Sequence, residues 1–360
     1  MIVFLLPDLR GGGAERVNLD LAYQFARKGH RVEFVLMKAR GEFLAEAEAK
    51  FSVVDLNCSR ARNLPGVLAR YLRQNRPDVL LAAMWPLTVI APLMRLTGYC
   101  GRIVVSEHGI LSAAYSSWGR VHRVALRSSM AISYRLAHVR IGVSAGVADD
   151  LAALSGLPRR MFEVVHNPVP LRPYPDNLQL KPVETLWATP RGARILSVGR
   201  LKPVKNQALL LHAFAKMKHP NAKLMFVGAG TGEANLRALA AELSVSDNVI
   251  FAGFYTDPTP FYQTADLFVL SSNYEGFGNV IVEALACGTP VVATDCPSGP
   301  AEILENGEYG RLVPVRDPQA LAQAMQEALT ASHDPALLKR RADDFAPAIV
   351  AKRYLELLCL

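Results

Sequence analysis

Short apolar runs rich in β-branched residues alternate along the chain with longer segments of helical periodicity. The first run, residues 2–7, predicts a strand, and residues 11–30 predict a glycine loop and an amphipathic helix that ends near Gly29. The residues expected to share one face of this helix are Leu19, Ala22, Tyr23 and Ala26.

The alternation continues to residue 315. Further strands are predicted at 31–37, 51–57, 78–84, 102–108 and 139–145, and then at 193–201, 223–230, 248–254, 266–272, 289–295 and 309–315. Helical patterns separate these runs, and strand–helix–strand repetition favours a parallel sheet with helices on both faces. The predicted fold class is therefore α/β, with two doubly wound domains in tandem.

Chain length and a proline-rich break divide the chain. Its 360 residues suit two domains of ordinary size, and five prolines fall within 167–182. We predict a first domain at 1–168, a linker at 169–190 and a second domain at 191–345. The last segment, 346–360, is predicted as an amphipathic helix that could pack back on the first domain.

The charge is uneven along the chain. Residues 1–170 contain 22 Lys and Arg against 13 Asp and Glu, a net charge of +9, whereas residues 171–360 contain 18 against 19, a net charge of −1. These two values sum to the +8 of the whole chain. The imbalance predicts an anionic partner for the first half.

Basic and apolar residues are mixed at 116–140. This mixture suits contact with anionic lipid headgroups; a solvated helix face is the alternative, and nucleic acid is not predicted because no binding motif for it appears. The residues concerned are Arg120, Arg123, Arg127, Arg135 and Arg140, with Trp118, Val121, Leu126, Met130 and Ile132.

Cysteine use and hydropathy predict a cytoplasmic protein. The five cysteines include no C-x-x-C pair, which argues against a disulfide framework or a zinc site and favours a reducing compartment. The longest apolar stretch, 79–94, is shorter than a membrane span and contains Pro86 and Pro92, so a strand, a turn and a helix explain it better. The N-terminal run has no basic residues ahead of it, and we interpret it as a buried strand rather than a signal peptide.

Two loops are candidates for binding phosphate. Gly11, Gly12 and Gly13 lie between a predicted strand and a predicted helix, where backbone N–H groups favour an anion. Arg200 and Lys205 follow another strand end, where two cations can bind a diphosphate. The alternatives are a turn that merely needs glycine and a solvated pair of cations.

The segment 227–233, VGAGTGE, matches a dinucleotide-binding fingerprint only in part. Glu233 replaces the third glycine, and the segment is not in the first unit of its sheet. A nicotinamide enzyme is therefore not favoured, although the loop at Gly228 can still line a nucleotide pocket.

Two glutamates eight residues apart, Glu275 and Glu283, interrupt an apolar stretch. A helix predicted from near Asn279 places Glu283 in its first turns and Glu275 in the glycine loop ahead of it. Glu283 can accept hydrogen bonds from ribose hydroxyls and Glu275 from those of a sugar ring, while N–H groups near Gly278 can meet phosphate. Solvated glutamates are disfavoured by the apolar flanks, and a hydrolase with paired carboxylates is disfavoured by the nearby Arg and Lys.

Glu107 and His108 follow a strand of the first domain. A lone histidine is often structural, but the carboxyl end of a sheet is where ligands bind. No D-x-D triplet occurs, so the usual carboxylates for a metal that bridges a diphosphate are missing. We predict no metal site, with positive side chains and helix dipoles in its place.

The motifs together resemble the family 4 glycosyltransferases of the GT-B fold over nearly the whole chain. The resemblance rests on GGGAER (11–16), GRLKPVKN (199–206), VGAGTGE (227–233) and the E-x7-E pair within EGFGNVIVEALACGTPVVAT (275–294). It implies two Rossmann-like domains facing a central cleft and transfer that retains the anomeric configuration. The segment TDCPSGPAEIL (294–304) resembles members that add hexose or N-acetylhexosamine to polyprenyl-diphosphate sugars, although Ala301 stands where a basic residue is usual.

The resemblance also implies roles for residues. Glu283 would bind ribose, Glu275 the transferred sugar, and Arg200 and Lys205 the departing diphosphate, while His108 would lie near the sugar on the acceptor side. The expected catalytic residues are Arg200, Lys205, Glu275 and His108. The expected donor-binding residues are Gly12, Gly13, Gly228, Glu275, Gly276, Phe277, Gly278, Asn279, Val280 and Glu283.

The sequence thus predicts a retaining, metal-independent enzyme without a cofactor. It would move a sugar from a nucleotide-diphosphate donor, expected to be a UDP-sugar, to a glycan or polyprenyl-diphosphate-linked acceptor in cell-surface polysaccharide synthesis. We expect it at the cytoplasmic face of the inner membrane, in peripheral contact with anionic lipid. The alternatives are a UDP-sugar epimerase of the same architecture and a catalytically silent sugar-nucleotide-binding subunit.

Overall fold

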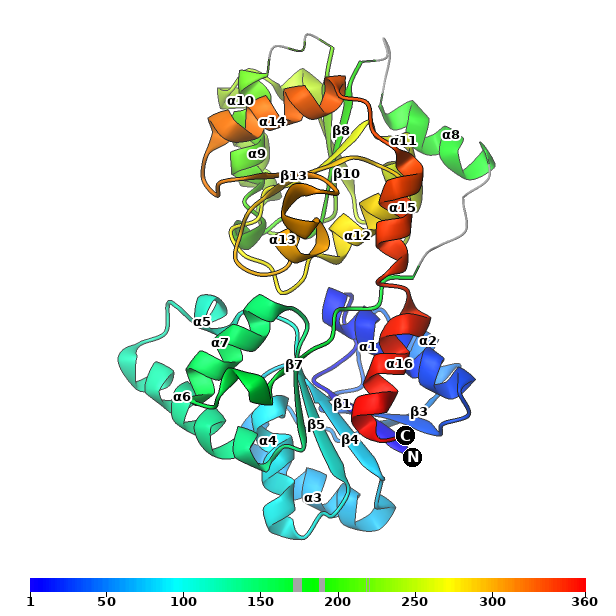
Figure 1. Cartoon of the computed structure of the whole chain (residues 1–360), viewed down its shortest axis with the longest axis vertical. Helices are drawn as coiled ribbons and strands as arrows, with labels where there is room; N and C mark the ends of the chain where they lie inside the picture. Colours follow the sequence, from blue (N-terminus) through cyan, green and yellow to red (C-terminus); the bar gives the residue numbers. More distant parts are fainter. Residues whose placement is uncertain (171–176, 188–191, 218, 220) are drawn as a thin grey trace. The chain divides into compact units, whose positions relative to one another are not determined.

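The computed structural model describes residues 1–170, 177–187, 192–217, 219 and 221–360. The chain forms two compact units (Figure 1): Met1–Pro170 with Ala346–Leu360, and Leu171–Phe345. The described part of the predicted linker has secondary structure of its own. It contains helix α8 (Asn177–Leu186), which contacts helix α11 (Thr259–Thr264) of the second unit. Trp187 anchors this region, because its buried indole N–H donates to Thr264 Oγ1 at 3.0 Å.

The first unit is built on a parallel sheet. Its described strands pair in the order β3-β2-β1-β4-β5-β6-β7. The strands are β1 (Ile2–Leu6), β2 (Val32–Leu36), β3 (Ser52–Asp55), β4 (Val79–Ala83), β5 (Arg102–Glu107), β6 (Val139–Gly142) and β7 (Glu163–Val164). The helices are α1 (Gly13–Arg27), α2 (Leu44–Glu48), α3 (Leu64–Asn75), α4 (Leu87–Leu93), α5 (Leu111–Ala114), α6 (Arg120–Ser133), α7 (Ala145–Ser155) and α16 (Pro347–Leu358).

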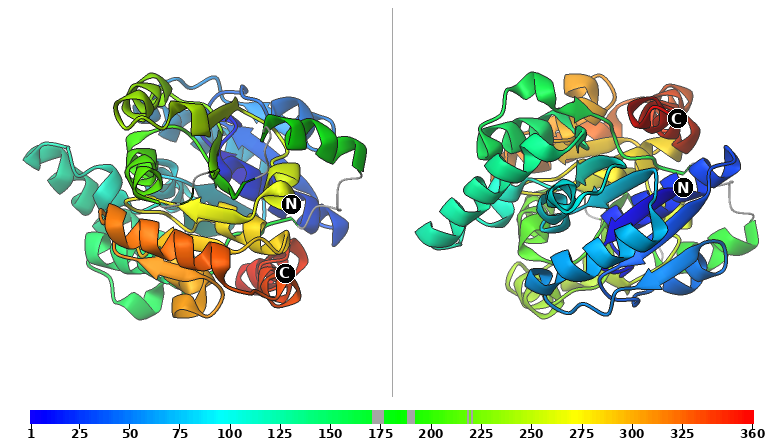
Figure 2. Two further views of the ribbon diagram at one scale, coloured as in Figure 1. Left: turned by 90° about the horizontal axis from the view of Figure 1, so that it is seen from above. Right: turned by 90° about the horizontal axis from the view of Figure 1, so that it is seen from below.

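Helices cover both faces of this sheet (Figure 2). Alternate side chains along β1 point to opposite faces. Phe4 joins a buried cluster with α1 and α16, and Leu5 joins another with α3 and α4. The C-terminal helix α16 is thereby part of the first unit, where Arg102 Nε donates to Leu357 O at 3.1 Å.

The second unit repeats the plan with described strands in the order β10-β9-β8-β11-β12-β13, again all parallel. The strands are β8 (Arg194–Val198), β9 (Lys223–Val227), β10 (Val249–Gly253), β11 (Leu267–Leu270), β12 (Val291–Thr294) and β13 (Arg311–Val313). Besides α8 and α11, the helices are α9 (Gln207–Lys216), α10 (Glu233–Glu242), α12 (Asn279–Ala286), α13 (Pro300–Ile303), α14 (Pro318–Thr330) and α15 (Pro335–Asp343).

The predicted architecture of two Rossmann-like parallel sheets is confirmed. Each predicted strand is present, and β7 was not predicted because two residues carry too little pattern to be recognised. Of the residues predicted to share one face of α1, Leu19 and Ala22 are buried, Tyr23 is half-buried and Ala26 is exposed. The most deeply buried face is displaced from the predicted one, because it also includes Val17, Leu21 and Phe25. Gly29, with φ +87°, follows the end of this helix as predicted.

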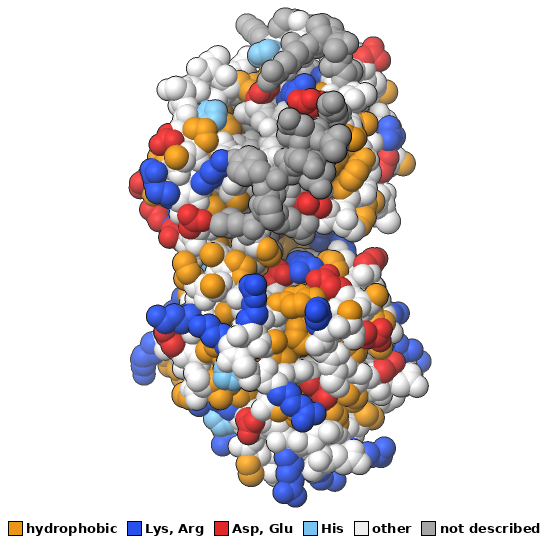
Figure 3. Space-filling view, turned by 90° about the vertical axis from the view of Figure 1, so that its right-hand side faces the viewer, with side chains coloured by type: hydrophobic (Ala, Val, Ile, Leu, Met, Phe, Trp, Pro, Cys, Tyr) orange, Lys and Arg blue, Asp and Glu red, His pale blue; other side chains and the backbone are white. Residues whose placement is uncertain are grey.

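The basic segment at 116–140 divides between surface and interior. On α6, Val121, Val124 and Ile132 are 78%, 59% and 63% exposed, while Leu126 and Met130 are buried. Arg140 does not belong to the surface: it lies on β6, where its Nε donates to Tyr134 O at 2.6 Å and its Nη2 to Ala137 O at 2.7 Å. Lys and Arg side chains are spread over the first unit in the view of Figure 3, in keeping with its positive charge.

Candidate active site

Strands β8 and β11 are neighbours in the second sheet, although β9 and β10 separate them in sequence. Chain connections leave in opposite directions at such a point, so the loops beyond the strand ends diverge and leave room for a ligand. The loop after β8 carries Arg200 and Lys205, and the loop after β11 carries Glu275. The topology therefore joins residues that are about seventy positions apart in the chain.

Lys205 and Glu275 form an ion pair. Lys205 Nζ lies 2.6 Å from Glu275 Oε1 and 2.8 Å from Oε2, and the side chains are 21% and 9% exposed. Ser272 Oγ also donates to Glu275 Oε1, at 2.6 Å. The carboxylate is held by three charged or polar contacts in a nearly dry site, where hydrogen bonds that involve charge are strong.

The two loops are tied together by further hydrogen bonds. Asn206 Nδ2 donates to Asn273 Oδ1 at 3.1 Å, and the backbone N–H of Asn273 donates to Val204 O at 2.8 Å. Thr294, at the end of β12, donates to Ser272 O at 2.7 Å. These contacts preorganise Lys205 and Glu275 before any ligand binds.

A cluster of three cations lies on the loop after β8. Arg200 and Lys202 are exposed, and Lys205 is half-buried. Although the side chain is exposed, surrounding protein atoms partly desolvate the Lys202 ammonium group. This desolvation and repulsion from Lys205 and Arg200 lower its pKa. An anion bound here would relieve that repulsion. Lys202 was missed by the motif reasoning, although the sequence signal, a lysine between two selected cations, was present.

Glu283 lies on α12, which begins at Asn279 as predicted, and Glu275 precedes that helix. The Glu283 carboxylate is half-buried and accepts a hydrogen bond of 2.7 Å from the hydroxyl of Tyr262 on α11. Burial and the neighbouring Glu283 carboxylate raise the pKa of Tyr262 well above its usual value, so the tyrosine stays a donor. Tyr262 was another residue that sequence reasoning missed, since nothing in its local pattern marks a distant partner.

The glycine loop ahead of α12 has the geometry of a backbone binding element. Gly278 has φ +104° and precedes the helix, a conformation that glycine adopts without strain. Ser298 Oγ holds the loop by donating to Gly276 O at 2.9 Å. The Phe277 ring is buried against Phe345, so only the backbone of this residue is available to a ligand. Asn279 and Val280, which open the helix, are partly exposed.

The conformation of Gly228 has a structural cause. It has φ +140°, and a Cβ atom there would lie 2.1 Å from Gly199 O. The loops after β8 and β9 are joined by backbone bonds from Gly199 to Val227 and from Leu201 to Ala229. This close approach by itself requires glycine, so the residue type alone is no sign of a ligand.

The glycine loop of the first unit follows β1, with Gly12 ahead of α1 and Gly13 as its first residue. A carboxylate already lies on it: the N–H of Gly11 donates to Glu42 Oε2 at 2.6 Å. Gly12 packs so closely against Glu15 that a Cβ atom would lie 2.2 Å from a carboxylate oxygen. A phosphate on this loop would have to displace one or both carboxylates.

At the carboxyl end of β5, Glu107 is fully buried. It accepts hydrogen bonds from Thr88 Oγ1 and, at 3.2 Å, from the backbone N–H of Trp85. Burial raises its pKa to about 7. His108 lies beside it, and burial lowers the pKa of its imidazole to about 4. His108 Nε2 is 3.4 Å from Ser106 Oγ, which is 3.1 Å from the hydroxyl of Tyr354 on α16. His108 is therefore neutral at physiological pH.

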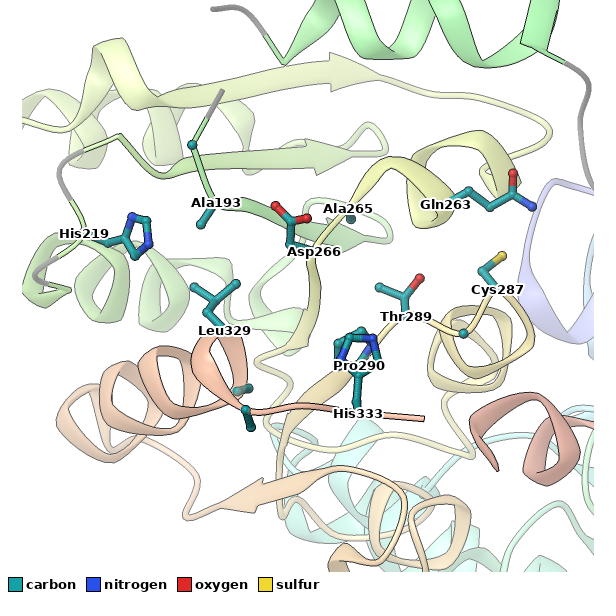
Figure 4. Close-up of a pocket in the computed structure, with 14 residues that line it drawn as sticks. Ala193, His219, Gln263, Ala265, Asp266, Cys287, Thr289, Pro290, Leu329 and His333 are labelled. Carbon is teal, nitrogen blue, oxygen red and sulfur yellow. The ribbon is translucent and has the colours of Figure 1, made fainter. Parts of the chain in front are cut away.

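A pocket of about 650 Å³ in the second unit lies elsewhere (Figure 4). It is lined by residues such as Ala193, Asp266 and Pro290, which precede β8, β11 and β12. This is the edge of the sheet opposite to Lys205 and Glu275, so the pocket is not part of the candidate active site.

Within the part of the chain that the structure describes, no group of three or more His, Cys, Asp or Glu side chains could hold a metal ion. No helix in the same described ranges is long and apolar enough to cross a membrane. All five cysteines are unpaired thiols.

Two family models match the chain, Glycosyltransferase Family 4 at residues 11–172 and Glycosyl transferases group 1 at 189–344. The lipopolysaccharide core biosynthesis glycosyltransferase LpsE of Rhizobium meliloti is 35% identical over 363 residues, covering 97% of this chain and 96% of its own.

A Campylobacter jejuni N-acetylgalactosamine-N,N'-diacetylbacillosaminyl-diphospho-undecaprenol 4-alpha-N-acetylgalactosaminyltransferase is 29% identical, over 89% of this chain and 88% of its own. The crystal structure of HepE from Anabaena in complex with UDP superposes with a TM-score of 0.85 at 23% identity and full coverage of both chains. The chain belongs to glycosyltransferase family 4 and has the GT-B fold.

Proposed function

We propose that this glycosyltransferase transfers a hexose or N-acetylhexosamine from a UDP-sugar to a glycan or polyprenyl-diphosphate-linked acceptor, in the synthesis of a cell-surface polysaccharide. The observation that carries the proposal is the ion pair of Lys205 with Glu275 beside Arg200 and Lys202. It puts a carboxylate for sugar hydroxyls next to a cation cluster for a diphosphate, the two chemical parts of a sugar nucleotide.

In the proposed donor complex the diphosphate lies against Arg200, Lys202 and Lys205. Glu275 accepts hydrogen bonds from the transferred sugar, and Glu283 accepts them from the ribose. The Gly276–Val280 backbone contacts sugar or phosphate. The relatives support the nucleotide and the acceptor class: HepE was solved with UDP, and the C. jejuni enzyme is named for a diphospho-undecaprenol acceptor.

The proposed chemistry is a front-face displacement. The bond from the anomeric carbon to the diphosphate oxygen breaks, the bond to the acceptor oxygen forms on the same face, and the acceptor proton passes to the departing phosphate. The anomeric configuration is retained without an enzyme nucleophile, because the acceptor oxygen attacks the face from which the diphosphate departs. No metal is required, because the cation cluster stabilises the leaving charge. His108, neutral beside Glu107, belongs to the acceptor side.

The test is a screen of labelled UDP-, GDP- and ADP-sugars with lipid extract and EDTA, with products identified by mass spectrometry and their anomeric configuration by NMR. Transfer from a UDP-sugar with retention supports the proposal. Conversion of the sugar nucleotide without an acceptor would instead identify an epimerase, and binding without any reaction would identify a silent subunit. Loss of transfer in EDTA that returns with a divalent cation would contradict metal independence.

We also propose that α6 contacts an anionic membrane surface at the cytoplasmic face of the inner membrane. Exposed Val121 and Val124 alternate with the exposed side chains of Arg120, Arg123 and Arg127, a mixture suited to lipid headgroups. Co-sedimentation with phosphatidylglycerol vesicles should exceed that with phosphatidylcholine vesicles and should fall in the R123E/R127E variant. Equal binding to both vesicles would overturn this contact.

A further inference from the structure

Three aromatic side chains gather beyond the carboxyl ends of β4 and β5. The ring centroids of Trp85 and Tyr115 are 5.0 Å apart, those of Trp85 and Trp118 are 5.5 Å apart, and those of Tyr115 and Trp118 are 4.2 Å apart. All three side chains are partly exposed. None belongs to the two buried clusters described above, those of Phe4 and of Leu5. This aromatic cluster therefore keeps part of its ring surface accessible.

The backbone beneath the cluster is held in place from below. The backbone N–H of Trp85 donates to the buried carboxylate of Glu107, and Glu107 is itself held by Thr88 and Tyr134. Met84, which precedes Trp85, has φ +67°, a left-handed conformation unusual for its residue type, and its N–H donates to Ser106 O at 3.1 Å. Hydrogen bonds on both sides therefore hold the backbone that carries the Trp85 side chain.

The indole N–H of Trp85 is buried and has no hydrogen-bond partner. An unsatisfied buried donor loses its hydrogen bonds to water without replacement, so native proteins rarely leave one without a reason. A ligand oxygen would satisfy it. The cluster thus combines apolar ring faces with an unsatisfied donor on one of its rings.

We propose that Trp85, Tyr115 and Trp118 form the subsite for a sugar residue of the acceptor. A pyranose has an apolar C–H face, which packs against aromatic rings, and hydroxyl oxygens that accept from an indole N–H. The Trp85 and Trp118 rings meet at 70°, which makes an angled wall for a chair-shaped ring rather than a parallel slot for a flat base.

The neighbouring charge fits the same acceptor. Trp118 is two residues before α6, and the centroid of its ring lies 5.7 Å from that of the His122 imidazole. Arg120 and Arg123, both exposed, follow on that helix and suit a diphosphate that joins the sugar to a lipid. This inference rests on the proposed glycan or lipid-linked acceptor and names residues that would recognise its sugar.

The chain has three tryptophans, two of them in the cluster and the third, Trp187, buried in the second unit. In the full-length W187F variant, tryptophan emission therefore reports only on the cluster. We would titrate this variant with the methyl α- and β-glycosides of glucose, galactose, N-acetylglucosamine and N-acetylgalactosamine, and with UMP as the flat-base competitor.

We expect a saturable change in emission with at least one glycoside and none with UMP. Adding Trp118→Ala should raise the half-saturating concentration about tenfold or more, and adding Trp85→Phe, which keeps a ring but removes the N–H, should do the same. Tyr23→Ala, which removes an aromatic ring paired with Phe51 elsewhere in the first unit, should leave it unchanged. Thermal melting checks that each variant folds, and Trp118→Phe replaces Trp118→Ala if the latter does not.

The inference is overturned if no glycoside gives a saturable change, if the change persists undiminished in both cluster variants, or if only UMP gives one. These outcomes are separable from failure of the proposed function. Glycoside binding without UDP-sugar transfer would support the aromatic subsite and contradict the proposed UDP-sugar donor. UDP-sugar transfer without a glycoside response would support the proposed donor and overturn the aromatic subsite.

Discussion

Lys205 and Glu275 meet in an ion pair of 2.6 and 2.8 Å in which both carboxylate oxygens face one ammonium group. The pair links the cation loop after β8 to the glycine loop before α12. The sequence motifs predict that the lysine binds phosphate and that the glutamate binds the sugar. The structure adds that the two groups are coupled, so a ligand that engages one of them acts on both.

The coupling predicts a non-additive double-mutant cycle. Lys205→Met and Glu275→Gln should each destabilise the second unit, because each leaves one charge of a largely buried pair without its counter-ion. The double variant should be more stable than the sum predicts, with a coupling of about 1–3 kcal/mol. Urea unfolding of the four proteins measures it, and additive effects would show that the pair contributes no mutual stabilisation.

Arg200→Ala and Lys205→Ala should each lower turnover by about 10²-fold or more, the loss seen when one preorganised charge-stabilising donor is removed. The exposed Arg237→Ala on α10 is the matched control, since it removes a cation of the same unit that pairs with Glu233. Steady-state kinetics with the donor identified by the screen provide the test. Near-normal turnover in both loop variants would rule out their proposed role on the diphosphate.

Tyr262→Phe should raise KM for the donor about tenfold with little change in kcat. The substitution removes the 2.7 Å hydrogen bond that orients Glu283, and a ribose contact acts equally in the ground and transition states. Trp187→Phe removes another buried hydrogen bond to α11, away from Glu283, and should leave KM unchanged. If both variants behave alike, Tyr262 supports the fold of α11 rather than the orientation of Glu283.

Glu107 should make the first unit less stable as pH rises from about 4.5 to 7. The folded protein keeps this proton to about pH 7, whereas the unfolded chain releases it near 4.5, so the unfolded state binds fewer protons across this interval. The expected loss is about 3 kcal/mol. Urea unfolding of the W187F variant at pH 5 and 7.5 should show most of this loss. Adding Glu107→Gln should remove the loss. If the free energy of unfolding changes with pH by the same amount in both proteins, the raised pKa is contradicted.

His108 should stay neutral down to about pH 4 in the folded protein. The unfolded chain takes up this proton near pH 6.5, so the stability that the neutral imidazole supplies is present above that value and declines as pH falls toward 4. Turnover should therefore show no inflection from His108 between pH 5 and 8. An NMR titration of the imidazole follows the group directly, and a midpoint near 6.5 would contradict the lowered pKa.

Much of the architecture follows from local pattern alone. Strands β1 and β12, predicted at 2–7 and 289–295, and the start of α12 at Asn279 could be predicted because apolar periodicity and glycine act within a few residues. Arg140 shows the limit: in sequence it resembles its exposed neighbours on α6, yet its strand is interior and its guanidinium bonds to backbone carbonyls. Burial of a charged residue depends on partners that local pattern does not identify.

For the site, residue types and their spacing were sufficient to select Lys205, Glu275 and Glu283, because the chemistry of phosphates and hydroxyls restricts which side chains can bind them. Which of these residues touch one another was decided by the strand order β8-β11, which joins loops far apart in sequence. The same holds for Tyr262 on Glu283 and for Trp85 beside Trp118. Such pairs arise only after the sheet has assembled, since their positions depend on long-range packing rather than on neighbouring residues.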